Sequence, residues 1–373
     1  MAESWVPTIR KRIMLRVLGL IARAGKPGRA GVDEQGVSRI LVIELWNIGD
    51  VVLTIPFLAQ LRKKFPGARV TLLCRPHARE ILAGSGLVDE FIESDLSWTD
   101  QTTRRNPFAY NWRELFRIRH ELRRGRFDLA FQARRHVREH VLLWLSGARR
   151  RVGLALMDEN PILTDAIAQP TPNGHKVDDW LALLGPFGGA VKVESPQLAI
   201  ADSERAWADE FIRARMSSGK LVGIHPGARI PEKRWPLERF REVARTLAAR
   251  GGVAVLSFSD ASGYGRDLGS IPGVVNAEVT LRQMMALMAR CSFLLCNDSG
   301  PMHIAAALSV PVVAVFGDGI SDWFSPLGTG HEIVTPASGV GEISGADRGK
   351  GIESVPVSDV LEAVGRIERS IAQ

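Results

Sequence analysis

The 373-residue sequence has only three cysteines and no long apolar run. Cys74, Cys291 and Cys296 lie in or beside apolar stretches without a spacing typical of metal ligands, so we expect buried, reduced thiols. No apolar run reaches the roughly 18 residues that a membrane-spanning helix needs. Residues 13–22 are apolar but contain Arg16, and no convincing cleavage site follows them. We therefore expect a cytoplasmic protein with neither signal peptide nor transmembrane helix.

A dinucleotide-binding motif is also missing. The first predicted strand, residues 39–45, leads into a turn that ends at Gly49-Asp50 and lacks the GxGxxG pattern of NAD-binding folds. This turn argues against NAD as a cofactor.

Basic residues concentrate in two regions of a chain whose formal net charge is +7. Residues 1–31 hold seven Lys and Arg against one acid, and residues 104–151 hold fourteen Arg against four acids, which leaves the rest of the chain at −9. Two basic regions in an otherwise acidic protein favour an anionic surface or substrate as partner. Nucleic acid is not expected, because no helix-turn-helix, zinc or RNP pattern accompanies the charge.

Each basic region allows two interpretations. Residues 9–23 predict a basic amphipathic helix, which can lie in a membrane interface or pack on the domain or a partner chain. In the second region, guanidinium groups such as those of Arg134 and Arg135 match phosphates and carboxylates, and the aromatic side chains between them offer faces for sugar rings. Most of these arginines are nevertheless expected on solvated helix faces in scattered ion pairs.

Segments with strand and helix patterns alternate along the chain, which predicts an α/β fold with buried parallel strands. Expected strands span residues 39–45, 69–74, 127–132, 221–225, 253–258, 274–277, 293–296 and 310–316, and expected helices span 51–65, 111–124, 137–146, 177–184, 237–250, 281–290, 302–308 and 358–371. A Gly- and Pro-rich passage at residues 185–195 separates two domains. The predicted parts are a basic segment and linker (1–37), two Rossmann-like domains (38–190 and 191–355) and a closing helix (356–373).

The chain is organised around residues 292–317, where an apolar strand ends at Asn297-Asp298-Ser299-Gly300 and Pro301 opens a short helix. The carboxyl ends of parallel strands are where open α/β sheets bind ligands, so this turn should face one. Gly300 lets a ligand approach the backbone, and the free amides and helix dipole favour phosphate. Because Asp298 would repel phosphate, we assign it to sugar hydroxyls, with capping of the helix as the alternative.

Three ordered motifs together resemble glycosyltransferase family 9, the lipopolysaccharide heptosyltransferases, over roughly residues 39–330. They are Ile48-Gly49-Asp50 continuing to Pro56; His225-Pro226-Gly227 followed by Lys233 and Trp235-Pro236; and Asn297 to His303 followed by Ala305-Ala306-Ala307 and Val310-Pro311.

The resemblance implies a GT-B fold, in which two Rossmann-like domains face each other across a cleft. It also implies inverting transfer of heptose from ADP-heptose to a Kdo or heptose of the lipopolysaccharide inner core, an anionic lipid-linked acceptor. Asp50 would be the general base, with capping of the following helix as the alternative. Lys233 would bind the donor diphosphate, unless it merely pairs with Glu232 on a solvated loop.

The other site residues come from the motif segments, from the second basic region and from a family-like segment at residues 173–176. Besides Lys233, the donor-binding candidates are Gly227, Arg229, Asp298, Ser299, Gly300 and His303. The weaker acceptor-binding candidates are Arg134, Arg135, His175 and Lys176. No DxD-like metal motif accompanies them, so we expect no metal and no cofactor, with leaving-group charge met by lysine and a helix dipole.

Two departures from the family pattern leave the nucleotide open. Ala228 and Arg229 stand where the family often has hydroxyl residues, and Asp260 is the only acid near the position that often holds the ribose. A glycosyltransferase with another nucleotide sugar, a nucleotide-sugar epimerase, and a non-catalytic nucleotide-sugar binder at the membrane are therefore alternatives. An enzyme of this family would lie peripherally on the cytoplasmic face of the inner membrane.

Overall fold

The computed structural model describes residues 34–96, 111–156, 162–170, 174–188, 193–216, 218–260, 262–317, 321–336 and 351–372. The chain divides into two compact units between Glu194 and Ser195. The predicted helix at residues 9–23 lies outside the described residues. Within them, no helix is both long and apolar enough to cross a membrane.

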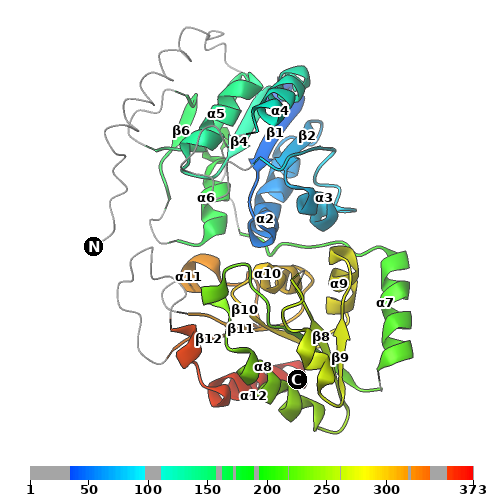
Figure 1. Cartoon of the computed structure of the whole chain (residues 1–373). Coiled ribbons are helices and arrows are strands. Elements are labelled where there is room, and N and C mark those ends of the chain that lie inside the picture. Colours follow the sequence, from blue (N-terminus) through cyan, green and yellow to red (C-terminus); the bar gives the residue numbers. More distant parts are fainter. Residues whose placement is uncertain are drawn as a thin grey trace. The chain divides into compact units, whose positions relative to one another are not determined.

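The described residues of the first unit form a parallel six-stranded sheet in the order β3-β2-β1-β4-β5-β6 (Figure 1). Its strands are β1 (Arg39–Glu44), β2 (Arg69–Cys74), β3 (Glu90–Glu93), β4 (Leu129–Gln132), β5 (Arg150–Leu154) and β6 (Asp165–Ile167). Its α-helices are α2 (Ile48–Lys64), α3 (Pro76–Leu82), α4 (Trp112–Gly125), α5 (Val137–Ser146) and α6 (Lys176–Ala182), and 3-10 turns span Glu34–Gly36 and Gly185–Phe187. β1 therefore lies centrally, between β2 and β4, although β4 follows it by about 90 residues.

Alternating residues of these strands bury two faces of the sheet. On one face, Leu41 and Ala130 pack with Ile118 of α4 and Leu142 of α5. On the other face an aromatic cluster joins Phe57 of α2, Phe131 of β4 and Trp180 of α6, with ring centroids 5.0 to 5.3 Å apart. Helices thus cover both faces, as expected for a buried parallel sheet.

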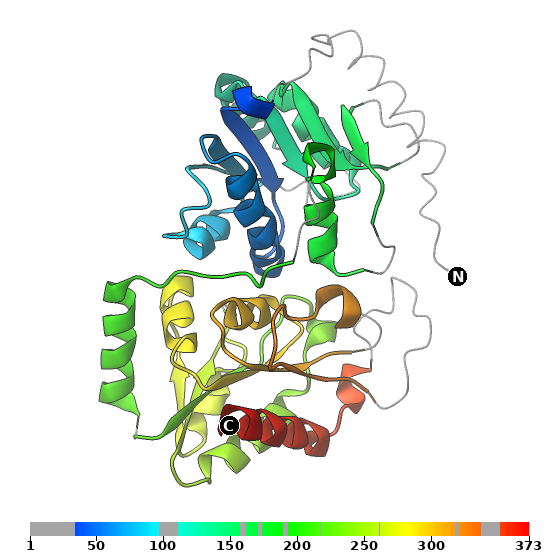
Figure 2. The same cartoon turned by 180° about the vertical axis from the view of Figure 1, so that it is seen from behind.

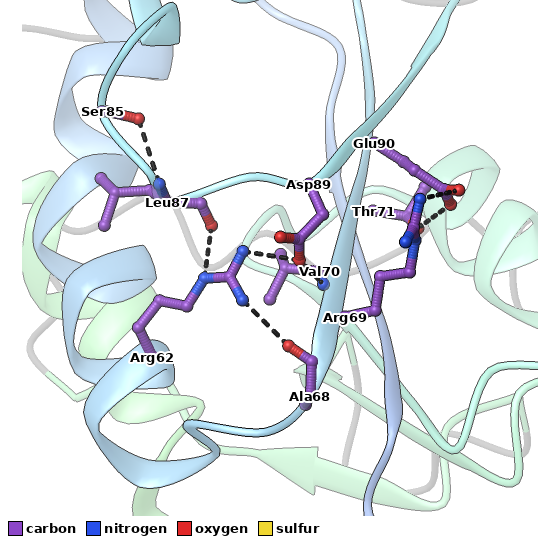
Figure 3. A network of polar contacts seen from close by, with 9 residues as sticks. All are labelled: Arg62, Ala68, Arg69, Val70, Thr71, Ser85, Leu87, Asp89 and Glu90. Atoms are coloured by element: carbon purple, nitrogen blue, oxygen red, sulfur yellow. Dashed lines mark hydrogen bonds and ion pairs between the residues drawn. The ribbon is translucent and has the colours of Figure 1, made fainter.

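A polar network fixes the end of α2 to the edge of this sheet (Figure 3). Arg62 donates to the carbonyls of Leu87 (3.0 Å) and Ala68 (2.9 Å), and it forms an ion pair with Asp89 at 2.6 Å. Asp89 also accepts from the backbone N–H of Val70 at 2.7 Å. These contacts satisfy loop carbonyls that would otherwise lack partners, so the network has a structural role.

The described residues of the second unit form another parallel six-stranded sheet, in the order β12-β11-β10-β7-β8-β9 (Figure 2). Its strands are β7 (Lys220–His225), β8 (Val253–Phe258), β9 (Val274–Ala277), β10 (Phe293–Asn297), β11 (Val312–Val315) and β12 (Glu332–Val334). Its α-helices are α7 (Asp202–Arg215), α8 (Leu237–Ala248), α9 (Leu281–Met288), α10 (Gly300–Ala307), α11 (Ser321–Phe324) and α12 (Val357–Ala372), and 3-10 turns span Pro231–Lys233, Arg266–Ser270 and Ile352–Ser354. One core packs α8 and α12 against the sheet, through residues such as Phe240, Val364 and Phe293.

These two parallel sheets confirm the predicted α/β class and nearly all the predicted segments. The three cysteines are buried and unpaired, as expected. The main error concerns the start of α2, which was predicted at Val51, with Asp50 as its cap in the alternative interpretation. The helix begins at Ile48 with Asn47 at the N-cap position, and Asp50 occupies its first turn.

Candidate functional site

In the first unit, Asp50 lies just beyond the carboxyl end of β1. One carboxylate oxygen accepts the backbone N–H of Asn47 at 3.2 Å, and the other forms an ion pair with Arg134, which follows β4. The Asp50 side chain is 12% exposed and that of Arg134 is 20% exposed, so both reach solvent at this edge of the sheet. The first-turn position of Asp50 thus leaves one oxygen for a charged partner or a substrate.

A connected set of side chains holds this ion pair in place. The guanidinium of Arg134 lies 4.3 Å from the ring centroid of Trp46, a cation–π contact. The Trp46 indole N–H donates to Glu139 at 2.6 Å, and the side-chain amide of Gln132 donates to the other oxygen of Glu139. Glu139 therefore orients the indole on which Arg134 rests.

Glu44 completes this cluster at the last position of β1. Its carboxyl accepts the backbone N–H of Trp46 at 2.9 Å and is 1% exposed. Burial raises the pKa of Glu44 to about 8, against the opposing effect of Arg134, and burial likewise raises the pKa of Glu139. Burial disfavours the charge of Arg134, but Asp50 and the two glutamates outweigh it and raise the Arg134 pKa. One arginine therefore sits among three carboxyl groups.

Replacing Glu44 with Gln should flatten the dependence of stability on pH. Folded Glu44 keeps its proton up to about pH 8, whereas the unfolded chain releases it near 4.5, so the free energy of unfolding falls as pH rises through this window. We expect the fall in Tm between pH 5.5 and pH 8 to shrink by about 2 °C or more in Glu44→Gln, measured by scanning calorimetry. Glu90→Gln is the control, because the pKa of Glu90 is lowered, mainly by its hydrogen bond from Arg69, and its titration lies below this window. An unchanged slope in Glu44→Gln would contradict the burial argument.

The acceptor-binding candidates occupy different surroundings. Arg134 joins the Asp50 cluster, whereas Arg135 is exposed and donates to the carbonyl of Ala155 and the side chain of Gln169. His175 is the N-cap of α6, where its Nδ1 accepts the backbone N–H of Val177 at 3.2 Å.

Lys176 is 8% exposed and forms an ion pair with Asp179. Its pKa is lowered by burial and by the nearby charge of Arg134. Of the four acceptor candidates, Arg135 is thus the exposed cation, while His175 and Lys176 have structural contacts of their own.

In the second unit, the sequence motifs meet at the carboxyl ends of β7 and β10. Lys233, at the end of a short 3-10 turn, forms an ion pair with Asp298, which follows β10. Asp298 is 8% exposed, and the Lys233 ammonium also lies 5.9 Å from the ring centroid of Phe324. Lys233 therefore pairs with another donor-site candidate and not with Glu232.

The start of α10 presents a polar group without a protein partner. Ser299, and not Asp298, occupies the N-cap position of α10. The Ser299 hydroxyl makes no cap hydrogen bond. That oxygen is buried and has no hydrogen-bond partner among the described residues. Gly300 and Pro301 follow as the first helical residues, and His303 is buried one turn on. A buried hydroxyl beside helix-start amides suits an oxygen-rich ligand.

Asn297 ties the second and third motifs together. Its side chain accepts the backbone N–H of Trp235 at 3.0 Å and donates to the carbonyl of Pro226 at 2.7 Å. Gly227 is close-packed, because a Cβ there would lie 3.0 Å from His225 and from Asp260. Burial lowers the pKa of His225 to about 4, so this packing surrounds a neutral imidazole.

The loop residues that left the identity of the donor nucleotide open in the sequence have distinct roles. Asp260 accepts the backbone N–H groups of Ser262 and Tyr264, at 2.9 and 3.0 Å, which folds its own turn. Arg234 joins that turn to the second motif through Asp260 (3.5 Å) and the ring of Tyr264 (4.4 Å). Arg229 is exposed.

Sequence reasoning missed the residues that support the site. Glu44 and Gln132 end otherwise apolar strands, and a polar residue at that position was an available signal. Glu139 and Trp46 carried no comparable pattern, because their contact joins α5 to the turn after β1.

Comparisons with known proteins agree with the motifs. The sequence model of Glycosyltransferase family 9 (heptosyltransferase) matches residues 115–339, which include the second and third motifs. Lipopolysaccharide heptosyltransferase 2 of Escherichia coli is 26% identical over 337 residues, which cover 84% of this chain and 92% of that protein. The similarity therefore extends over most of both chains.

Solved structures show the same fold. The glycosyl transferase family 9 protein of Veillonella parvula superimposes with a TM-score of 0.75 at 24% identity, covering 91% of this chain and 99% of that one. E. coli ADP-heptose LPS heptosyltransferase II gives 0.70 at 22% identity, covering 90% and 100%. The two Rossmann-like units are thus of the predicted GT-B class. This chain belongs to glycosyltransferase family 9, the heptosyltransferase family, and is a glycosyltransferase.

Proposed function

We propose that this enzyme transfers heptose from ADP-heptose to a hydroxyl of a Kdo or heptose in the lipopolysaccharide inner core, with inversion at the anomeric carbon. The observation that carries the donor assignment is the Lys233–Asp298 pair beside the Ser299 hydroxyl, which has no hydrogen-bond partner among the described residues. The E. coli relatives, a lipopolysaccharide heptosyltransferase and an ADP-heptose LPS heptosyltransferase, support the choice of donor and acceptor.

Each group at the donor site has a distinct task. Lys233 offers a compact positive charge to the diphosphate, whose negative charge grows as the bond to the sugar breaks. The amides at the start of α10 and the Ser299 hydroxyl supply further donors to phosphate oxygens. Once diphosphate draws Lys233 away, Asp298 is available to accept hydrogen bonds from the sugar hydroxyls.

Asp50 serves the acceptor. Its carboxylate takes the proton from the attacking hydroxyl as the new bond to the anomeric carbon forms and the bond to ADP breaks. Arg134, which pairs with Asp50 in this structure, can then bind an anionic group of the acceptor or hold the carboxylate in position. The supporting observation is that this ion pair reaches solvent at the carboxyl edge of the sheet.

Titration calorimetry with ADP-, UDP- and GDP-linked sugars tests the donor. We expect ADP-heptose to bind at least tenfold more tightly than the other sugars, which corresponds to a difference in binding free energy of about 1.4 kcal/mol or more. EDTA should leave its affinity unchanged, because Lys233 and α10 provide the positive charge in this proposal. Preference for a UDP or GDP sugar would indicate another glycosyl donor, loss of binding in EDTA would contradict metal independence, and no binding at all would favour the non-catalytic alternative.

A further inference from the structure

Helix α4 carries two exposed aromatic side chains. Phe116 is 66% exposed and Trp112 is 49% exposed, and they are the aromatic members of the exposed large hydrophobic residues. They are four positions apart in the sequence, so they lie one above the other on the same side of the helix. Exposed aromatic side chains grouped on one helix face mark an interaction surface rather than scattered surface hydrophobicity.

The charges of α4 are sorted by face. At 3.6 residues per turn, Arg113, Arg119, His120, Arg123 and Arg124 fall on the same half of the helix as the two aromatic residues. The two acids of the helix, Glu114 and Glu121, fall on its flank, and both are bound by Arg117. The outward face therefore carries basic and aromatic side chains and no acid.

The arginines of this face are available to a partner. Arg113, Arg119 and Arg124 are exposed, and none of them makes an ion pair with a described residue. This distinguishes them from Arg150, which pairs with Asp165 at 2.7 Å, and from Arg151, which is buried against backbone carbonyls. Arg150 and Arg151 therefore have structural contacts, whereas Arg113, Arg119 and Arg124 make no ion pair among the described residues.

The orientation of α4 is fixed by its opposite side. Ile118 and Leu122 are fully buried in the core shared with α5 and the sheet. Arg123 is the exception on the outward half, because its Nε donates to the carbonyl of Leu145 in the neighbouring helix α5 at 2.8 Å (Figure 1). Because the inner side is held in this way, the aromatic and basic face has to point away from the core.

We propose that this outward face of α4 docks on an anionic lipid bilayer. Phe116 and Trp112 would enter the interfacial layer, where aromatic rings are favoured, while the unpaired arginines contact lipid phosphates. Charge complementarity selects anionic over zwitterionic lipid, since basic residues near a surface are attracted to its negative potential. The inference does not depend on donor or acceptor identity, and it concerns residues other than the basic segment 9–23.

Vesicle co-sedimentation of the full chain tests the proposal. We expect the protein to pellet with vesicles of mixed phosphatidylglycerol and phosphatidylcholine, and not with phosphatidylcholine alone. Phe116→Ala and the double variant Arg113→Glu/Arg119→Glu should each lower the partition coefficient on anionic vesicles about tenfold or more. Added salt should weaken binding of the wild-type chain.

Matched controls distinguish binding through this face from a general effect of charge or of exposed apolar surface. Arg205→Glu/Arg213→Glu makes the same charge change on exposed positions of α7, and Ile333→Ala removes an exposed apolar side chain from the second unit. Both controls should bind vesicles like the wild type. The proposal is wrong if the α4 variants bind vesicles like the controls. It is also wrong if the wild type binds phosphatidylcholine vesicles as well as anionic ones.

Activity on a delipidated, soluble acceptor separates this proposal from the proposed function. Phe116→Ala should transfer to that acceptor at the wild-type rate, since lipid contact is then irrelevant. A loss of this activity would show that α4 contacts the saccharide and would overturn the bilayer assignment. Absence of transfer by the wild type would instead count against the proposed function while leaving the vesicle result to stand.

Discussion

Replacing Asp50 with Asn is expected to lower turnover about 10²- to 10⁴-fold, the range that removal of a general base produces. Asn has the same shape, and its oxygen can still accept the backbone N–H of Asn47, so the first turn of α2 should persist. The donor site lies in the other unit of the chain, so the affinity for ADP-heptose should not change. Steady-state transfer kinetics and donor calorimetry on the same preparation measure the two quantities.

Asp89→Asn is the matched control for this prediction. Asp89 is also an ion-paired aspartate of the first unit, but its partner Arg62 belongs to the structural network of Figure 3. The Asp89→Asn substitution should lower thermal stability and leave kcat unaltered. Wild-type turnover in Asp50→Asn would remove Asp50 from the mechanism, and equal losses in both variants would point to a general structural defect.

Replacing Lys233 with Ala is expected to weaken ADP-heptose binding about 100-fold, because a charge-assisted contact to diphosphate is lost and Asp298 is left unpaired beside it. About 100-fold corresponds to roughly 2.7 kcal/mol. Calorimetry measures the affinity, and Lys220→Ala, at the opposite, amino end of β7, provides the control with normal binding.

The double variant Lys233→Ala/Asp298→Asn shows which of these two effects dominates. If Lys233 contacts the diphosphate, removing the charge of Asp298 restores only part of the affinity. Full recovery would mean that Lys233 serves only to neutralise Asp298, which would contradict its role as a phosphate ligand. The ion pair seen between them makes this comparison necessary, because a single substitution changes both groups.

The fold could be predicted largely from local patterns. Strands such as β2 and β8 are apolar runs bounded by turn residues, and their predicted and observed limits agree. Thr280 directly precedes the predicted helix 281–290, and its hydroxyl accepts the backbone N–H of Gln283 at 3.3 Å as the N-cap of α9. These features depend on neighbouring residues, which a sequence displays directly.

The contacts within the site could not be predicted in the same way. Asp50 and Arg134 are 84 residues apart, and they meet because β4 pairs with β1 in the sheet. Lys233 and Asp298 are separated by 65 residues and meet through the adjacent strands β7 and β10. The motifs identified the participants, but strand order decides which charges become partners.

Helix α2 shows how a local signal can also mislead. Gly49-Asp50 resembles a helix start, yet Asn47 occupies the N-cap position and Asp50 reaches back to its N–H. Asn and Asp both favour this position, so composition alone did not distinguish them. The shift of one helical turn places Asp50 within the helix, with one oxygen turned to Arg134.

Transfer itself is the most direct test of the central claim. The purified enzyme is incubated with ADP-heptose and a lipopolysaccharide inner-core acceptor that lacks heptose, or with one that carries a single heptose. The products are analysed by mass spectrometry, and NMR reports the anomeric configuration. We predict that one of the two acceptors gains the mass of one heptose residue, with release of ADP and inversion at the anomeric carbon. Failure to modify either acceptor, in a preparation that binds ADP-heptose and turns over a different acceptor, would contradict the proposed function.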